Sequence, residues 1–248
     1  MKIAGYMITK NGLSGMIKTA INSLYNTTDV IYVSDGGSTD GTKEWLEMTP
    51  KVDKVIEDTR KYNEKAHLIR ERVINKLLKE ESPDWLLALD DDEQLVRPVK
   101  TRKALKNKPI NKIAFDFYHL WDNIHYRIDG TWNPGTVNRI IGEKVSGQQD
   151  INIKGEGNHC PRIPHEVEEV KGISGAKLIH YGWRYKDDEL RKKKMEDKAE
   201  RDEDPIEIQR KHYKSIYREP ELKKIPYEWK SMLVDKYKDK QKNDLVPK

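Results

Sequence analysis

Four consecutive acidic residues directly follow a short apolar run in the first half of the chain. The acids are Asp90, Asp91, Asp92 and Glu93, and the apolar run is residues 85–89. A run of this length is typical of a buried strand, and open α/β sheets bind ligands at the carboxyl ends of their strands. If the chain stays extended, Asp90 and Asp92 point the same way and suit a Mg²⁺ or Mn²⁺ ion that carries a diphosphate. The alternative is a solvated acidic loop after a core strand.

Strand and helix patterns that alternate before the acidic run predict the scaffold that positions it. The expected strands are residues 3–8, 30–33, 52–56 and 85–89, and the expected helices lie near residues 14–24, 43–48 and 63–79. Alternation repeated in this way argues for a mostly parallel sheet with helices on its faces. The chain is therefore expected to be an α/β protein.

A further acid, Asp35, ends the second expected strand and opens the glycine-rich loop of residues 36–42. The loop lacks the Gly-Lys-Ser/Thr ending of a Walker loop and does not fit the Gly-x-Gly-x-x-Gly dinucleotide fingerprint. One interpretation is a tight strand-to-helix turn that uses glycine for unusual backbone angles. The other is that Asp35 shares the ligand-binding edge of the sheet with Asp90 and Asp92.

The order of these motifs resembles the family-2 glycosyltransferases of the GT-A fold. The motifs are Thr9-Lys10-Asn11 after the first strand, the Gly-Ser-Thr-Asp-Gly-Thr loop that ends at Thr42, and Asp90-Asp91-Asp92 after Leu89. The resemblance is clear up to the acidic run and patchier beyond it. It implies a GT-A catalytic domain, a nucleotide-sugar donor, and a Mn²⁺ or Mg²⁺ ion.

The resemblance also implies roles for single residues of the donor half. Thr9 and Asp35 would contact the nucleotide base, and Arg70 would approach the nucleotide from the helix before the acidic run. The alternative for Arg70 is a surface arginine that pairs along its own helix. The family often has an aromatic residue at the position of Lys10 and a second acid at Gly36, so the base of the donor stays open.

Within the acidic run, the resemblance places the ribose and the metal-bridged diphosphate on Asp90 and Asp92. Asp92 is the stronger metal candidate, and Asp90 either sits nearer the ribose or shares the ion. Asp91 is able to take either role.

Two further motifs in the second half also resemble this family. His165-Glu166 is followed downstream by His180-Tyr181-Gly182 and then by a basic segment. A neutral imidazole is a suitable third ligand for Mn²⁺, so His180 is the candidate. Glu166 is the candidate base for the acceptor hydroxyl, and His165 is its possible substitute. The alternatives are a strand-end histidine satisfied by backbone groups and a solvated glutamate.

Other residues of the second half are weaker candidates. Asp116 is a rival for the base. Trp121, Trp132 and Trp183 could stack on a sugar, although core packing is the favoured interpretation for each of them.

The elements of the second half carry no strand–helix alternation, which predicts a mixed edge of the sheet. The expected elements are a helix at residues 100–108, strands at 113–121, 126–132 and 137–141, and a long loop at 142–161. Asp129-Gly130 is a hairpin signal. The expected catalytic domain is residues 1–185, with a donor half at 1–97 and an acceptor half at 98–185, and residues 186–248 form a charged helical extension.

Composition limits the class of protein. The chain has 248 residues, 36% of them charged, and a net charge of +5. This mild charge permits a phosphate-rich partner without requiring one. The only cysteine, Cys160, excludes an internal disulfide, and no apolar run approaches the ~20 residues of a membrane span. We expect a cytoplasmic protein, with peripheral contact to a membrane left open.

The sequence therefore predicts a metal-dependent, inverting glycosyltransferase whose acceptor is a glycan or a lipid-linked intermediate. One alternative is a transferase that glycosylates modified bases of nucleic acids, which the basic tail permits without any base-reading motif. Another is a nucleotide-sugar-binding module without catalysis. A nucleotidyltransferase ranks low because no glycine-rich basic loop lies near the amino terminus.

Overall fold

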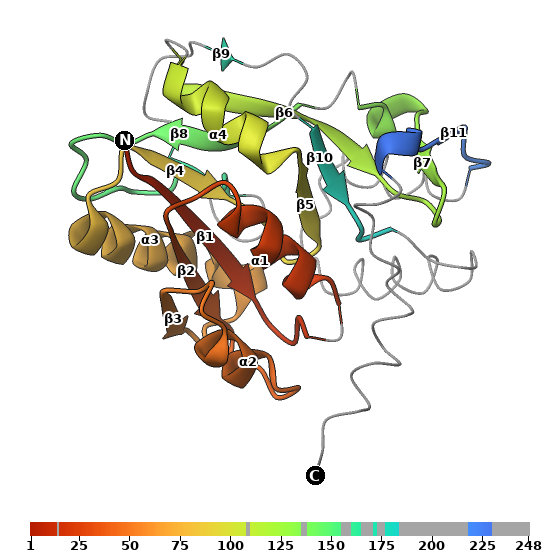
Figure 1. Cartoon of the computed structure of the whole chain (residues 1–248). Helices are drawn as coiled ribbons and strands as arrows, with labels where there is room; N and C mark the ends of the chain where they lie inside the picture. Colours follow the sequence, from red (N-terminus) through yellow and green to blue (C-terminus); the bar gives the residue numbers. More distant parts are fainter. Residues whose placement is uncertain are drawn as a thin grey trace.

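A mixed, mostly parallel sheet forms the centre of the molecule, and helices cover both of its faces (Figure 1). This computed structural model describes residues 1–13, 15–107, 110–134, 138–154, 160–164, 171–172, 177–183 and 218–229. The α/β class and the sheet type that the sequence predicts are confirmed.

The main sheet joins a parallel half to a mixed half. Its strands follow the order β3-β2-β1-β4-β8-β6-β10-β5, and β9 lies beside β6. Their bounds are β1 (Ile3–Thr9), β2 (Val30–Asp35), β3 (Lys54–Glu57), β4 (Trp85–Ala88), β5 (Glu93–Val96), β6 (Lys112–His119), β8 (Asn138–Lys144), β9 (Lys171–Gly172) and β10 (Lys177–His180). The first four strands in the order are parallel, whereas β8 is antiparallel to β4 and β6, and β5 is antiparallel to β10.

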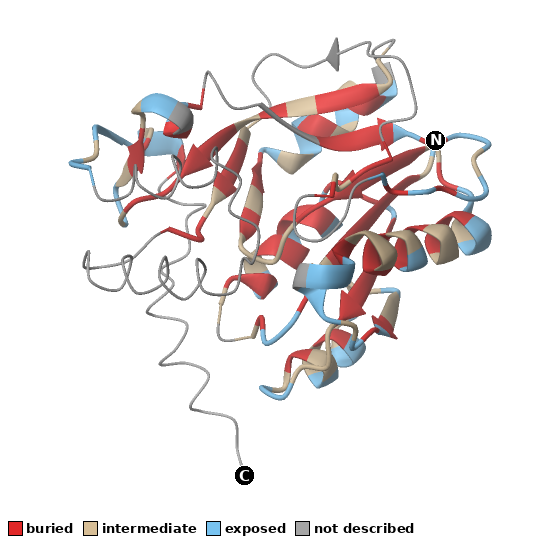
Figure 2. Cartoon of the chain, turned by 180° about the vertical axis from the view of Figure 1, so that it is seen from behind, coloured by how far each residue is buried: buried red, intermediate tan, exposed pale blue. Residues whose placement is uncertain are grey.

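Alternate residues of β1 show which helices cover which face of the sheet. The helices are α1 (Ile17–Tyr25), α2 (Thr42–Met48), α3 (Tyr62–Glu81) and α4 (Pro98–Asn107). Ile3 and Met7 share an apolar cluster with residues of α1, α2 and α4, whereas Ala4 and Tyr6 share another with residues of α3. Successive side chains of a strand point to opposite faces, so α3 lies on one face and the other three helices lie on the opposite face. Figure 2 shows that burial runs along the central strands while the outer sides of the helices are exposed.

β5 is a strand that the sequence does not predict, because its four residues begin with Glu93 and Gln94 and have no apolar alternation. It pairs with β10 and is also fixed to α1, since the backbone N–H of Leu95 donates to Ser23 Oγ at 3.3 Å. β5 therefore connects the acidic run to the body of the domain.

The hairpin signal at Asp129-Gly130 is wrong. β7 (His125–Arg127) ends before it, and Gly130 begins a 3-10 helix (Gly130–Trp132) with φ of +51°. The chain instead reverses between Leu120 and Tyr126, which form an antiparallel bridge. Asp122 holds this turn, because its carboxylate accepts the N–H groups of residues 124 and 125 at 2.7 Å each.

β8 continues to Lys144, so the irregular segment expected at residues 142–161 begins later. Most of the expected carboxyl-terminal extension lies outside the described residues, and the domain boundary at residue 185 stays a prediction. Within its described part, β11 (Leu222–Lys224) pairs with β7, and the ring of Trp229 lies 4.8 Å from that of Tyr118. Among the described residues, the structure has no helix that is both long and apolar enough to cross a bilayer.

Candidate functional site

The carboxyl ends of β1, β2 and β4 bring the candidate donor residues to one edge of the sheet. Thr9 and Asp35 are direct partners in the register of β1 and β2. The hydroxyl of Thr9 donates to Asp91 Oδ2 at 2.6 Å, which joins the end of β1 to the acidic run after β4. The structure thus gathers Thr9, Asp35 and Asp91 where parallel strands end and ligands of open α/β sheets bind.

Asp35 is completely buried, and its own loop satisfies its carboxylate. Oδ1 accepts the backbone N–H groups of Gly37 and Ser38 at 3.0 and 2.9 Å, and Oδ2 accepts the hydroxyl of Ser38 at 2.6 Å. The glycine-rich loop is therefore a tight turn fixed by Asp35, as one interpretation of the sequence predicts. A contact between Asp35 and a nucleotide base stays a prediction.

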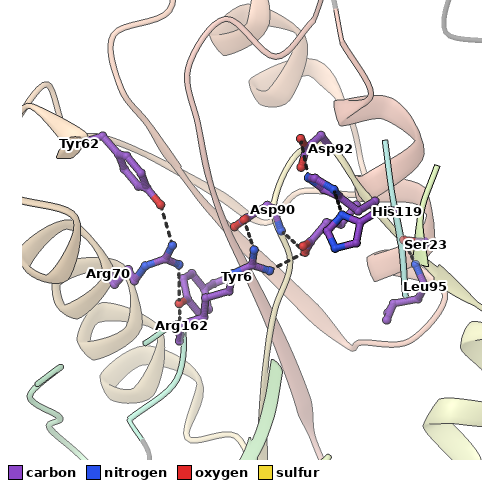
Figure 3. A network of polar contacts seen from close by, with 11 residues as sticks. Tyr6, Ser23, Tyr62, Arg70, Asp90, Asp92, Leu95, His119 and Arg162 are labelled. Carbon is purple, nitrogen blue, oxygen red and sulfur yellow. Dashed lines mark hydrogen bonds and ion pairs between the residues drawn. The ribbon is translucent and has the colours of Figure 1, made fainter. Parts of the chain in front are cut away.

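The acidic run does not continue as an extended strand. β4 ends at Ala88, and the N–H of Glu93 donates to the carbonyl of Asp90 at 3.1 Å, which closes a turn over residues 90–93. The expectation that strand alternation makes Asp90 and Asp92 converge is wrong for this reason. Each of the three aspartates instead contacts a different partner. Figure 3 shows Asp90 beside Arg162 and Asp92 on the side of His119.

Asp91 faces the end of β1 and is unusually basic for an aspartate. Burial, followed by the charge of Asp92, raises the pKa of Asp91 to about 7, although the hydrogen bond from Thr9 acts in the opposite direction. A Cβ atom at Gly12 would lie 2.6 Å from Thr9 Oγ1 and 3.0 Å from Asp91 Oδ2, so the loop after β1 packs closely on this pair. Asp91 therefore changes charge near neutral pH.

Asp90 contacts Arg162, a residue that the sequence analysis does not single out. Arg162 Nη2 donates to Asp90 Oδ2, and Nη1 donates to Glu93 Oε2 at 2.5 Å. The Arg162 side chain is 10% exposed and that of Glu93 is completely buried. A single arginine between prolines gives no signal of this role, since its partners lie about seventy positions earlier in the chain.

Asp92 contacts His180 at the end of β10. His180 Nε2 lies 3.3 Å from Asp92 Oδ2, and His180 Nδ1 lies 2.9 Å from His119 Nδ1. Two neutral imidazoles that face each other through Nδ1 need one N–H and one lone pair there, so their tautomers are linked. If Nδ1–H of His180 donates to His119, Nε2 keeps the lone pair that a metal ligand requires.

Gly182 lies directly against the Asp92–His180 pair. A Cβ atom there would lie 2.5 Å from His180 Nε2 and 2.6 Å from Asp92 Oδ2, so only glycine fits beside the two side chains. Among the described residues, no three His, Cys, Asp or Glu side chains gather into a metal cluster. Mg²⁺ is commonly held by one or two carboxylates plus substrate phosphates and water, so two protein ligands are compatible with such an ion.

Arg70 is not a surface arginine, and this alternative is wrong. Its side chain is on the inner side of α3, is 4% exposed, and donates to the hydroxyls of Tyr6 and Tyr62 at 3.2 and 2.8 Å. The Tyr6 hydroxyl in turn donates to the backbone carbonyl of Arg162. Figure 3 shows this chain of contacts from α3 across β1 to the segment that carries Arg162.

The three tryptophans of the acceptor half form a buried cluster. Trp121, Trp132 and Trp183 are at most 4% exposed, and their rings meet edge to face. The favoured interpretation, core packing, is confirmed. The ring of Trp132 also lies 4.9 Å from that of His119, so the cluster supports the histidine pair from behind.

The candidates for the catalytic base have different outcomes. Glu166 and His165 lie outside the described residues, so both stay predictions. Asp116 is in the middle of β6, three residues before His119, which places it about 10 Å along the strand from the histidine pair. This position disfavours Asp116.

Sequence comparisons find relatives without an established activity. No family model matches the chain. An uncharacterised protein from Mycobacterium bovis and another from Mycobacterium tuberculosis are each 26% identical to it over 176 residues. The aligned part is 67% of this chain and 43% of each relative, so the chain spans less than half of their length.

Structure comparisons find distant likenesses. Staphylococcus aureus TarS, solved in complex with UDP-GlcNAc, has a TM-score of 0.39 and 18% identity, over 48% of this chain and 35% of that chain. A nucleotidyl transferase from Methanothermobacter thermautotroptrophicus has a TM-score of 0.31 and 12% identity, over 48% of this chain and 61% of that chain. Scores this low carry no argument about function, which rests on the site itself.

Proposed function

We propose that the chain is a metal-dependent, inverting glycosyltransferase that moves a sugar from a nucleotide-sugar donor to an acceptor hydroxyl. The observation that carries this proposal is that each aspartate of the acidic run has a different partner. Asp91 is tied to the end of β1, Asp90 is paired with Arg162, and Asp92 faces His180 beside Gly182. A merely solvated acidic loop has no need of such specific partners.

Charge balance supports a diphosphate ligand at this edge. Arg70 and Arg162 lie on one side of the acidic run, and Asp92 lies on the other (Figure 3). Arg162 is already paired with Asp90 and Glu93, whereas Arg70 donates to tyrosine hydroxyls, so Arg70 is the arginine suited to phosphate oxygens. A carboxylate with an imidazole is a suitable ligand pair for Mn²⁺ or Mg²⁺. Positive charge for a diphosphate would thus come from Arg70 and from the metal ion.

The proposed roles follow from these positions. Asp92 and His180 would hold the metal, which supplies charge to offset the leaving diphosphate. Asp90 would contact the ribose, and Thr9, Asp35 and Asp91 would shape the nucleotide side of the pocket. Arg70 would orient the nucleotide through Tyr62, whose hydroxyl it already contacts.

Direct displacement needs a base and no protein nucleophile. Glu166, or His165 in its place, would take the proton from the acceptor hydroxyl as that oxygen attacks the anomeric carbon from the side opposite the diphosphate. The configuration at the anomeric carbon is then inverted. The proposed acceptor is a glycan or a lipid-linked intermediate.

A thermal-shift screen of nucleotide sugars with and without Mn²⁺ tests the proposal. We expect at least one donor to raise the Tm, by more in the presence of Mn²⁺ than in EDTA, because the ion bridges the diphosphate and the protein. Slow hydrolysis of that donor by the purified protein separates an enzyme from a binding module. Donor binding without any hydrolysis or transfer would leave the binding module, and a panel without any stabilising donor would refute the proposal.

A further inference from the structure

α4 is at the centre of a stretch of chain that contains no acidic residue. Between Glu93 and Asp116 the sequence has basic residues but neither aspartate nor glutamate. The basic residues are Arg97, Lys100, Arg102, Lys103, Lys106, Lys108 and Lys112. In the whole chain 47 basic residues nearly balance 42 acidic ones, so positive charge is concentrated locally here.

The structure sorts the residues of α4 into an inner and an outer face. Thr101 and Leu105 are 4% and 3% exposed and pack towards the sheet. Lys100, Lys103 and Lys106 are exposed on the other side, together with Val99, which is 57% exposed. We call these four residues the α4 cationic face.

Arg102 has a different role from the exposed lysines. Its guanidinium pairs with Asp29 and also donates to the carbonyl of Thr27 at 3.0 Å, which fastens α4 to the segment before β2. The helix is therefore held in a fixed orientation, and its cationic face is directed to solvent. Arg102 thus stabilises the fold, whereas the charges of the exposed lysines face solvent.

We infer that the α4 cationic face binds the anionic surface of a lipid bilayer. The attraction is electrostatic, because basic side chains on a helix near an anionic bilayer surface contribute about 1 kcal/mol each. The segment Arg97–Asn107 contains no aromatic side chain that could stack on bases or sugar rings, which disfavours a nucleic acid or a glycan as the partner.

The position of α4 sets how this contact relates to the donor site of the proposed function. β5 runs from the acidic run at the carboxyl edge of the sheet back to its amino edge, and α4 follows it there. Arg102 of α4 accordingly pairs with Asp29, the residue before β2. A bilayer on the α4 cationic face would therefore hold the protein from the edge of the sheet opposite the donor site.

Vesicle sedimentation tests the inference directly, with the whole chain. The vesicles are phosphatidylcholine alone and phosphatidylcholine with about one third phosphatidylglycerol, whose anionic surface attracts lysines. The variant is Lys100→Glu with Lys103→Glu. The matched control is Lys65→Glu with Lys79→Glu, which makes the same change of net charge at exposed lysines of α3 on the opposite face of the sheet.

We expect binding to the anionic vesicles only, and binding that weakens with salt. Each lysine near such a surface contributes about a fivefold increase in partitioning, so the α4 variant should lose more than tenfold while the α3 control changes less than threefold. No binding by the unchanged chain, or equal loss in both variants, would overturn the inference. Tighter binding to duplex DNA that is lost in the α4 variant would reassign the face to nucleic acid.

The outcome is distinguishable from failure of the proposed function. The α4 variant keeps every residue of the donor site, so its thermal shift with the nucleotide sugar and Mn²⁺ should equal that of the unchanged chain. Loss of vesicle binding with an unchanged donor shift supports the inference. Vesicle binding without any donor shift would refute the proposed function and leave the membrane contact standing.

Discussion

Two regions of the site are held by contacts of different sequence separation. The glycine-rich loop after β2 is held by neighbours in the chain, whereas the acidic run and His180 are held by residues far away in the chain. At the end of β2, Asp35 is fixed by the two residues that follow Gly36 in its own loop. Near the acidic run, Asp90 is fixed by Arg162, and His180 is fixed by His119 from another strand. The first arrangement forms with a local turn, whereas the second requires the whole sheet. The two regions should therefore respond differently to substitution.

The largest expected effect is on stability, at the ion pair between Arg162 and the buried Glu93. Arg162→Met leaves Glu93 completely buried without its guanidinium partner, and removal of one partner of a buried pair costs about 3–5 kcal/mol of unfolding free energy. Urea denaturation measures the loss. Arg162→Met with Glu93→Gln should recover more than half of it, because the uncompensated charge is gone. Equal stability of the single and double variants would show that Glu93 is not the cause.

The next effect concerns activity and leaves the fold intact. Asp92→Ala should lower nucleotide-sugar turnover by at least about a hundredfold, because a half-exposed carboxylate that faces His180 is lost from the metal site. Its Tm should change by no more than a few degrees, since such a side chain contributes little to stability. Asp53→Ala, a matched change at the far end of the sheet, is the control for turnover. Full activity of the Asp92 variant would contradict the metal assignment.

A smaller effect, on metal affinity, is expected at His119, which contacts the proposed metal ligand His180. His119→Phe keeps the aromatic packing against Trp132 but removes the Nδ1 atom that faces His180. Loss of a partner that orients a metal-ligating imidazole typically lowers metal affinity by about 10–100-fold. Titration with Mn²⁺, followed by the signal of the free ion, measures this. His125→Phe is the control, because that histidine pairs with Asp122 in the turn after β6.

The smallest effect is a change in the pH dependence of stability at Asp91, which the hydroxyl of Thr9 contacts from the end of β1. Asp91 has a folded pKa of about 7, raised from 3.8, so the folded state binds more protons than the unfolded state between these values. The free energy of unfolding that this group contributes therefore falls as pH rises from about 4 to about 7. Asp91→Asn should remove this slope, and its stability relative to the unchanged chain should rise with pH across that window.

The measurement for Asp91 is urea denaturation at several pH values in metal-free buffer. We expect the difference in unfolding free energy between the unchanged chain and the Asp91→Asn variant to grow by more than about 1 kcal/mol from pH 4 to pH 7. A constant difference from pH 4 to pH 7 would mean that Asp91 keeps an ordinary pKa.

Short-range chemistry is the part of the site that the sequence predicts well. The buried apolar runs before Thr9, Asp35 and Asp90 locate three strand ends, and a common edge for parallel strands follows from topology. The glycine-rich loop after Asp35 is recognisable because its hydrogen bonds are made within a few residues. The α/β class is predictable for the same reason.

Long-range pairing is the part that sequence patterns do not reveal. Nothing in the residues around Arg162 shows that it pairs with two acids about seventy positions away, and β5 has too little apolar pattern to be recognised as a strand. Extended alternation failed for Asp90 and Asp92 because a turn begins where the strand ends. The burial of Arg70 between two tyrosine hydroxyls is likewise a result of packing between α3 and β1.

Gly182 gives the molecule a position where shape can be changed without a change of charge. A Cβ atom there would lie 2.5 Å from His180 Nε2 and 2.6 Å from Asp92 Oδ2, and glycine at this point needs no left-handed backbone angle that alanine would strain. Gly182→Ala would thus force the imidazole or the carboxylate to move, while every ionisable group of the site is still present. Such a protein would separate what the exact placement of the two side chains contributes from what their charge contributes.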